Sequence, residues 1–149
     1  MYLAMSNVAW YHGEIDDFLF LITSLGCQGI ELAASMIWDE PVEVSSVERK
    51  AFRRKIQDTG LRLTGLQSLL FTHQELTLFS GEFQRRSMLD YLTKMMDLCY
   101  DLGGAVLVFG SPRNRNRGHV LIGEADAIAV EFFREIAQRA DDRGLFFCI

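Results

Sequence analysis

The feature that most constrains the fold of this chain is a regular alternation of short apolar segments with longer amphipathic ones. The short segments have the composition of β-strands, and they are Leu3–Ser6, Gly29–Ala33, Arg62–Ser68, Val106–Gly110 and Leu145–Ile149. Val106–Phe109 and Leu145–Ile149 are unbroken apolar runs, which are typical of parallel strands covered on both faces. Strands joined through helices form right-handed parallel crossovers, so this order predicts an α/β fold.

The segments between the strands have the periodicity of helices. Apolar residues recur at helical spacing in about Glu14–Leu25, Ser45–Gly60, Glu82–Leu102 and Glu124–Arg143. Ser45 and Glu48 have the spacing of a capping box, which predicts that the second helix begins at Ser45. Gly103 follows the third helix at the position of a C-terminal cap.

The loops that leave the strands are long, and the loops that enter them are short. The long ones are Ala34–Val44, Leu69–Gly81 and Ser111–Gly123. In barrels of parallel strands and in open doubly wound sheets alike, ligands bind at the C-terminal ends of the strands. We therefore expect the functional site among these three loops.

The spacing of the strands favours a barrel of the TIM type. Successive strand starts lie about 26 to 44 residues apart, and a unit of an eight-stranded barrel averages about 31 residues. The sequence contains neither the GxGxxG nor the GxxxxGK[ST] pattern of a nucleotide-binding doubly wound sheet. We expect residues 1–149 to be one domain, the N-terminal half of such a barrel, with four βα units and a fifth strand. Its open sheet edges would favour pairing with a second copy, which predicts a homo-oligomer.

Composition excludes several classes of protein. Hydrophobic residues make up 49% of the chain and charged residues 23%, as in ordinary globular proteins. No apolar run approaches the roughly 20 residues of a membrane-spanning helix. The net charge of −5 argues against a nucleic-acid partner. An odd number of cysteines without CxxC spacing, and no secretion signal, predict a cytoplasmic protein.

Polar residues near the ends of the first three strands are candidates for the site. Asn7 and Trp10 suit sugar binding, since an amide gives directional hydrogen bonds and an indole gives a flat apolar surface. In the alternative interpretation, Asn7 caps a turn and Trp10 fills the core. Glu31 interrupts an apolar strand, and in a barrel it would converge with Gln67 on the interior. Glu31 is a candidate general base, or a structural hydrogen-bonding group.

The loop after the fourth strand carries three arginines within five residues, at positions 113, 115 and 117. Guanidinium groups favour phosphate or carboxylate, so Ser111, Arg113 and Arg115 are candidates for substrate binding. The alternative is a solvated, mobile loop. The three histidines of the chain have no metal-ligand spacing.

Four motifs resemble those of the xylose isomerase-like TIM barrels: Ser6–Trp10, Gly29–Leu32, Leu66–Phe71 and Val108–Pro112. This family contains sugar-phosphate isomerases and epimerases, and endonuclease IV is a DNA-repair relative. The resemblance implies a (β/α)₈ fold, a small-molecule sugar or sugar phosphate as substrate, and a divalent metal (Mn, Mg, Co or Zn). It also implies proton transfer between adjacent carbons of the sugar, with the metal polarising the oxygens.

In the family, metal ligands come from the ends of strands five to eight, so no ligand can be assigned to a residue of this chain. We expect the chain alone to bind metal weakly if at all and to have no isomerase activity. Two alternatives stay open. One is an endonuclease IV-like metal-dependent nuclease, although Gln67 and Gly110 stand where that branch has histidines. The other is a non-catalytic half-barrel that binds an anion through Arg113 and Arg115.

Overall fold

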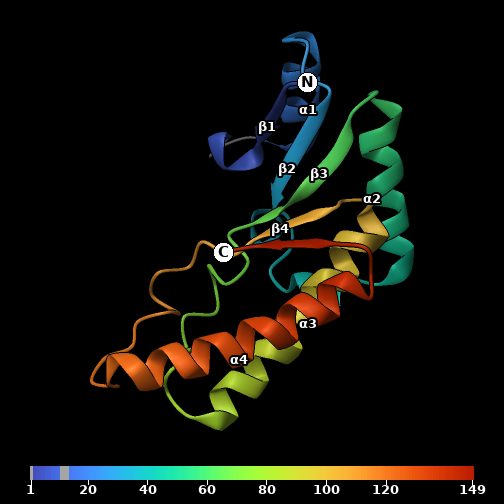
Figure 1. Cartoon of the computed structure of the whole chain (residues 1–149). Helices are drawn as coiled ribbons and strands as arrows, with labels where there is room; N and C mark the ends of the chain where they lie inside the picture. Colours follow the sequence, from blue (N-terminus) through green and yellow to red (C-terminus); the bar gives the residue numbers. More distant parts are fainter. Residues whose placement is uncertain (1, 11–13) are drawn as a thin grey trace.

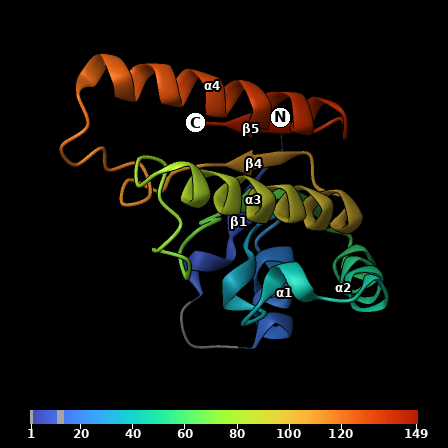
Figure 2. The same cartoon turned by 90° about the horizontal axis from the view of Figure 1, so that it is seen from below.

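A computed structural model describes residues 2–10 and 14–149 of the chain. Within these residues, five parallel strands form one sheet in the order of the sequence. The strands are β1 (Ala4–Ser6), β2 (Gly29–Ala33), β3 (Arg62–Gln67), β4 (Val106–Val108) and β5 (Phe146–Cys148). The helices are α1 (Ile15–Ser24), α2 (Ser46–Asp58), α3 (Glu82–Leu102) and α4 (Ile122–Asp141). The helices pack against one face of the sheet (Figures 1 and 2).

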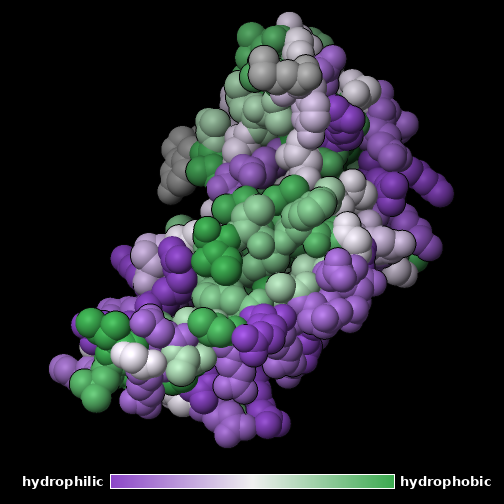
Figure 3. All heavy atoms as spheres, viewed as in Figure 1, coloured by the Kyte–Doolittle hydropathy of each residue, from purple (hydrophilic) through white to green (hydrophobic). Residues whose placement is uncertain are grey.

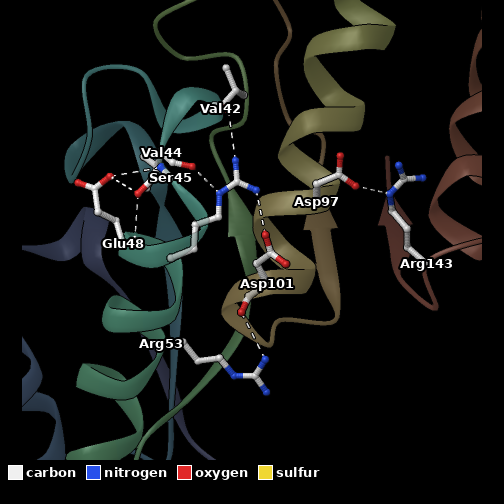
Figure 4. A network of polar contacts seen from close by, with 9 residues as sticks. Val42, Val44, Ser45, Glu48, Arg53, Asp97, Asp101 and Arg143 are labelled. Carbon is white, nitrogen blue, oxygen red and sulfur yellow. Dashed lines mark hydrogen bonds and ion pairs between the residues drawn. The ribbon is translucent and has the colours of Figure 1, made fainter.

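Local sequence signals set the helix ends. The Ser45 hydroxyl accepts a hydrogen bond from the Glu48 amide at 3.3 Å, and the Glu48 carboxylate accepts one from the Ser45 amide at 3.2 Å (Figure 4). The predicted capping box is therefore confirmed. Gly103 ends α3 in the left-handed conformation, with φ of 84°. The α4 helix begins and ends two residues before its predicted bounds.

The strand register sorts side chains onto two faces, because directly paired residues of parallel strands point to the same side. One row runs across the helix-covered face through Leu32, Leu66 and Leu107, which are fully buried. The neighbouring row runs along the other face, which we call the inner face. It contains Ser6, Glu31, Gly65, Val106 and Phe146.

The inner face of β4 and β5 is exposed. Phe146 is 70% exposed and Cys148 is exposed, while Val106 and Val108 are half-buried. These strands lie within the apolar surface at the centre of Figure 3. The expectation that both faces of these strands are covered is therefore wrong for the described residues. The helices lie against one side only, so an apolar run here reflects one buried row and one exposed row.

Gly65 allows β3 and β4 to approach each other closely. A Cβ atom at this position would lie 2.2 Å from the Val106 carbonyl oxygen, which is closer than any side chain tolerates. The register between β2 and β3 also shifts at Ile30/Glu31. After this irregularity, Glu31 pairs with Gly65 and Ala33 pairs with Gln67. Both polar residues consequently belong to the inner face.

Candidate functional site

Three polar residues, Ser6, Glu31 and Gln67, share the inner face on the neighbouring strands β1, β2 and β3. Ser6 is paired with Glu31, and the Gln67 amide donates a hydrogen bond to the Ser6 hydroxyl. Strand β2 lies between these two partners, and Ala33 is the residue of β2 that pairs with Gln67. Its small side chain leaves room for the Gln67 amide to cross. The register thus places Glu31 and Gln67 on the same face of the sheet, and a shared role for them in a site stays a prediction.

Glu31 has the environment of a carboxylate suited to proton transfer. It is half-buried, and burial raises its pKa above the ordinary value of a glutamate. Within the described residues, no side-chain hydrogen bond or ion pair involves its carboxylate. A carboxylate with a raised pKa exchanges protons more readily near neutral pH. Such groups are concentrated at functional sites.

Asn7 and Trp10 have structural contacts in this structure. The Asn7 side chain is buried, donates to the Ala33 carbonyl at 3.2 Å and accepts from the Ala33 amide at 2.7 Å. The Trp10 ring packs against Phe18, with ring centroids 5.9 Å apart. The Trp10 contact corresponds to the core-filling alternative, whereas Asn7 binds the Ala33 backbone, 26 residues away, and does not cap a local turn through these bonds. A role for either residue in sugar binding stays a prediction.

Asn114 anchors the arginine loop, a role that the sequence pattern does not indicate. Its side chain is 2% exposed, and its amide donates to the carbonyls of His73 at 2.8 Å and Leu76 at 2.6 Å. Its own carbonyl accepts from the Leu78 amide at 2.9 Å. Three hydrogen bonds therefore tie the β4–α4 loop to the β3–α3 loop. An asparagine between two arginines carries no sequence signal for this role.

A groove of about 430 Å³ opens between these two loops. Its walls include the apolar side chains of Leu70, Phe71 and Pro112, and its polar groups include Ser111 and Arg113. The Arg113 guanidinium donates to the side-chain oxygen of Gln74 at 3.0 Å. Ser111 and Arg113, both predicted from the sequence, thus line one groove.

The other two arginines of the loop point elsewhere. The Arg115 guanidinium carbon lies 5.8 Å from the centre of the Phe109 ring, and its Nε is buried without a hydrogen-bond partner in the described structure. Arg117 donates to the Val120 carbonyl at 2.7 Å. Arg115 therefore does not join Arg113 in the groove, and its predicted part in substrate binding is untested.

A histidine cluster connects three elements beside the groove. His73 Nδ1 lies 3.0 Å from a Glu75 carboxylate oxygen, and Nε2 lies 3.8 Å from one of Glu40. The His73 and Tyr91 rings are 4.3 Å apart. Burial, together with the charges of Glu40 and Glu75, raises the pKa of Tyr91 to about 12. Histidine spacing in the sequence does not indicate this cluster, because Glu40 and Tyr91 lie on other elements than His73.

Another hollow, of about 630 Å³, lies at the opposite end of the strands. Several of the arginines near it are engaged in structural contacts (Figure 4). Arg49 binds the Asp101 carboxylate at 3.0 Å, Arg53 binds the Asp101 carbonyl at 3.3 Å, and Arg143 binds Asp97 at 2.7 Å. These bonds hold α2, α3 and the turn before β5 together. We assign this hollow to packing between the helices.

Residues 19–149 match the sequence family described as xylose isomerase-like TIM barrel. The chain belongs to this family. Its five parallel strands, with helices on one side of the sheet, correspond to part of such a barrel. No curated protein matches the sequence significantly.

Solved structures of sugar-converting enzymes share the fold of this xylose isomerase-like chain. A D-psicose 3-epimerase, solved in the presence of D-fructose, matches with a TM-score of 0.75 at 20% identity, over 100% of this chain and 52% of its own. The D-psicose 3-epimerase of Clostridium cellulolyticum, solved with D-tagatose, matches with a TM-score of 0.76 at 16% identity, over 100% of this chain and 52% of its own. A sugar phosphate isomerase/epimerase from Parabacteroides distasonis matches with a TM-score of 0.68 at 13% identity, over 97% of this chain and 49% of its own. The chain thus spans about half the length of these structures, and at such identities the likeness concerns the fold alone.

The family implies a divalent metal, which protein side chains would hold through His, Cys, Asp or Glu ligands. Across residues 2–10 and 14–149, no three His, Cys, Asp or Glu side chains come together in an arrangement that would hold a metal ion. Glu31, on the inner face, belongs to no such group of side chains. The described residues therefore do not fit a metal centre. His12, one of the three histidines, lies outside the described residues.

No helix in residues 2–10 and 14–149 combines the length and apolar character needed to cross a bilayer.

Proposed function

We propose that this chain supplies one part of the active site of a sugar isomerase or epimerase that acts on a small sugar or sugar phosphate. Family membership supports the class of reaction. The observation that carries the proposal is the half-buried Glu31 carboxylate on the inner face, beside the hydrogen-bonded Ser6 and Gln67. This position, near the C-terminal ends of parallel strands, is where barrel enzymes have their active sites.

Glu31 has the chemistry needed for the proton transfer. Isomerisation and epimerisation both remove a proton from a carbon next to the carbonyl and return a proton to the same or the adjacent carbon. In an isomerisation, Glu31 accepts the proton as a carboxylate and returns it to the adjacent carbon as a carboxylic acid. In an epimerisation, Glu31 removes the proton, and a second acid delivers a proton to the opposite face of the same carbon. Its raised pKa brings these two states closer in energy near neutral pH. Ser6 and Gln67 orient the sugar through its hydroxyl groups.

Stabilisation of the enediolate formed after proton removal requires a further group. In the family a divalent ion supplies this stabilisation, and the described residues do not provide its ligands. We therefore propose that the 149-residue chain binds sugar but does not complete the reaction by itself.

Binding and turnover are measured separately to test the proposal. The chain is titrated with a panel of ketoses and aldoses, and backbone amide shifts are followed by NMR. We expect shifts around Ser6, Glu31 and Gln67, and weaker binding after Gln67→Ala. The control is Gln138→Ala, which removes an exposed amide on α4 bonded to Asp142. No shift with any sugar contradicts the proposed function.

Turnover is followed in deuterium oxide, with and without Mg²⁺, Mn²⁺, Co²⁺ or Zn²⁺. We expect the chain alone to incorporate no deuterium at the carbon next to the carbonyl. Deuterium incorporation that is lost in Glu31→Gln supports the role of Glu31 but contradicts the requirement for a further group. Incorporation unaffected by Glu31→Gln contradicts the role of Glu31.

A further inference from the structure

The arginine loop carries positive charge that the described chain does not neutralise. Elsewhere, carboxylates pair with arginines, as in the ion pairs of Arg49, Arg139 and Arg143. In residues 2–10 and 14–149, no ion pair involves Arg113, even though acidic residues outnumber lysines and arginines by 20 to 15. Its hydrogen bond goes to the neutral amide of Gln74. The guanidinium thus keeps its full charge and the other donors of its fork.

The backbone next to Arg113 is held in place. Asn114 follows it directly and is buried with three hydrogen bonds to the β3–α3 loop. Gln74, on that same loop, orients the guanidinium. A side chain oriented in advance loses less conformational entropy when it binds a ligand. The anchor fixes the backbone at Asn114, while Arg113 and residues 116–119 of the same loop are exposed to solvent.

The groove provides a suitable surrounding for an anion attached to a sugar. Its volume of about 430 Å³ lies within the range of small-molecule sites. The walls formed by Leu70, Phe71 and Pro112 are mainly apolar and offer surface to the carbon skeleton of a sugar, while the exposed Arg113 offers its donors to the anion. The Ser111 hydroxyl adds a polar group to the same groove.

The groove lies at the same end of the sheet as the proposed sugar site. Its two loops leave the C-terminal ends of β3 and β4, and Gln67 is the last residue of β3. We infer that Arg113 binds the oxyanion group, phosphate or carboxylate, of a sugar that extends from this groove toward Gln67. This inference deepens the proposed function and rests on it.

Binding of four ligands to the 149-residue chain tests the inference. Calorimetric titrations compare D-fructose 6-phosphate, a hexuronate, D-fructose and inorganic phosphate. Arg113→Ala is expected to weaken binding of one or both anionic sugars by about tenfold or more and to leave D-fructose unchanged. The stronger of the two anionic ligands identifies the group as phosphate or carboxylate. Arg113→Lys keeps the charge, so it is expected to restore part of the affinity.

The matched control is Arg117→Ala. It removes the same charge from the same loop, but Arg117 is bonded to the Val120 carbonyl and does not line the groove. We expect less than about a threefold change, which is the scale of a screened surface charge. Equal losses in Arg113→Ala and Arg117→Ala would mean a general field effect and would overturn the inference. So would anionic sugars that bind no more tightly than D-fructose.

Failure of the inference and failure of the proposed function give different results. Sugar binding that depends on Gln67 but not on Arg113 overturns the anion subsite and leaves the function standing. Inorganic phosphate that binds through Arg113, while no sugar binds, supports the anion subsite and overturns the sugar function together with its extension toward Gln67.

Discussion

The two faces of the sheet differ in the burial and polarity of their side chains. On the helix-covered face, Leu66 and Leu107 are fully buried and their row of side chains is apolar. On the inner face, Glu31 and Ser6 lie in one row with the exposed Phe146. The first row buries apolar surface against the helices and stabilises the fold. The second contributes less to stability, and it is therefore available for polar groups that do chemistry.

The largest effect is expected from matched truncations on the two faces. Leu66→Ala removes a fully buried side chain and should lower the free energy of unfolding by about 2–5 kcal/mol. Phe146→Ala removes a larger side chain that is 70% exposed and should change it by no more than about 0.5 kcal/mol. Urea unfolding measures both. Similar losses in the two variants would show that the inner face is covered in solution.

An intermediate loss of stability is expected where the β3–α3 and β4–α4 loops are tied together. Asn114→Ala leaves the Leu76 carbonyl without its side-chain donor and removes one of two donors from the His73 carbonyl, which still accepts from the Leu76 amide. It should cost about 1–3 kcal/mol. Hydrogen exchange of the Leu78 amide, which is bonded to Asn114, should accelerate. Asn116→Ala, on the exposed part of the same loop, is the control and should cost under about 0.5 kcal/mol. Unchanged protection of Leu78 would refute the anchoring role.

The smallest expected effect is a gain in stability, on replacing Glu31. Because burial raises the pKa of Glu31, the folded state disfavours its charged form, and stability is lost as the pH rises from the unfolded pKa through the folded pKa. Glu31→Gln should therefore stabilise the chain at neutral pH, by under about 1 kcal/mol. The gain should disappear in acid, where Glu31 is protonated in both states. Denaturation at several pH values measures it, and a less stable variant at neutral pH would reveal a stabilising partner for the carboxylate.

Much of the fold could be predicted because its signals are local. The capping box of Ser45 and Glu48 and the left-handed Gly103 involve residues within one helical turn of each other, so the sequence alone places those helix ends. The alternation of strands and helices likewise predicted the parallel order of the sheet. The exposure of Phe146 could not be predicted, because an apolar strand has the same sequence pattern whether one of its faces or both are covered.

The candidate site likewise combines features that the sequence determines with contacts that only the tertiary structure determines. The sequence by itself determined that Glu31 interrupts an apolar strand, that Gln67 stands at a strand end, and that arginines gather in one long loop. Only the tertiary structure decided which of these residues meet. The bond between Gln67 and Ser6 joins positions 61 residues apart, and Asn114 reaches 41 residues back to His73. Such contacts depend on strand register, on the register shift between β2 and β3 and on loop docking, which are properties of the packed sheet and of no local segment.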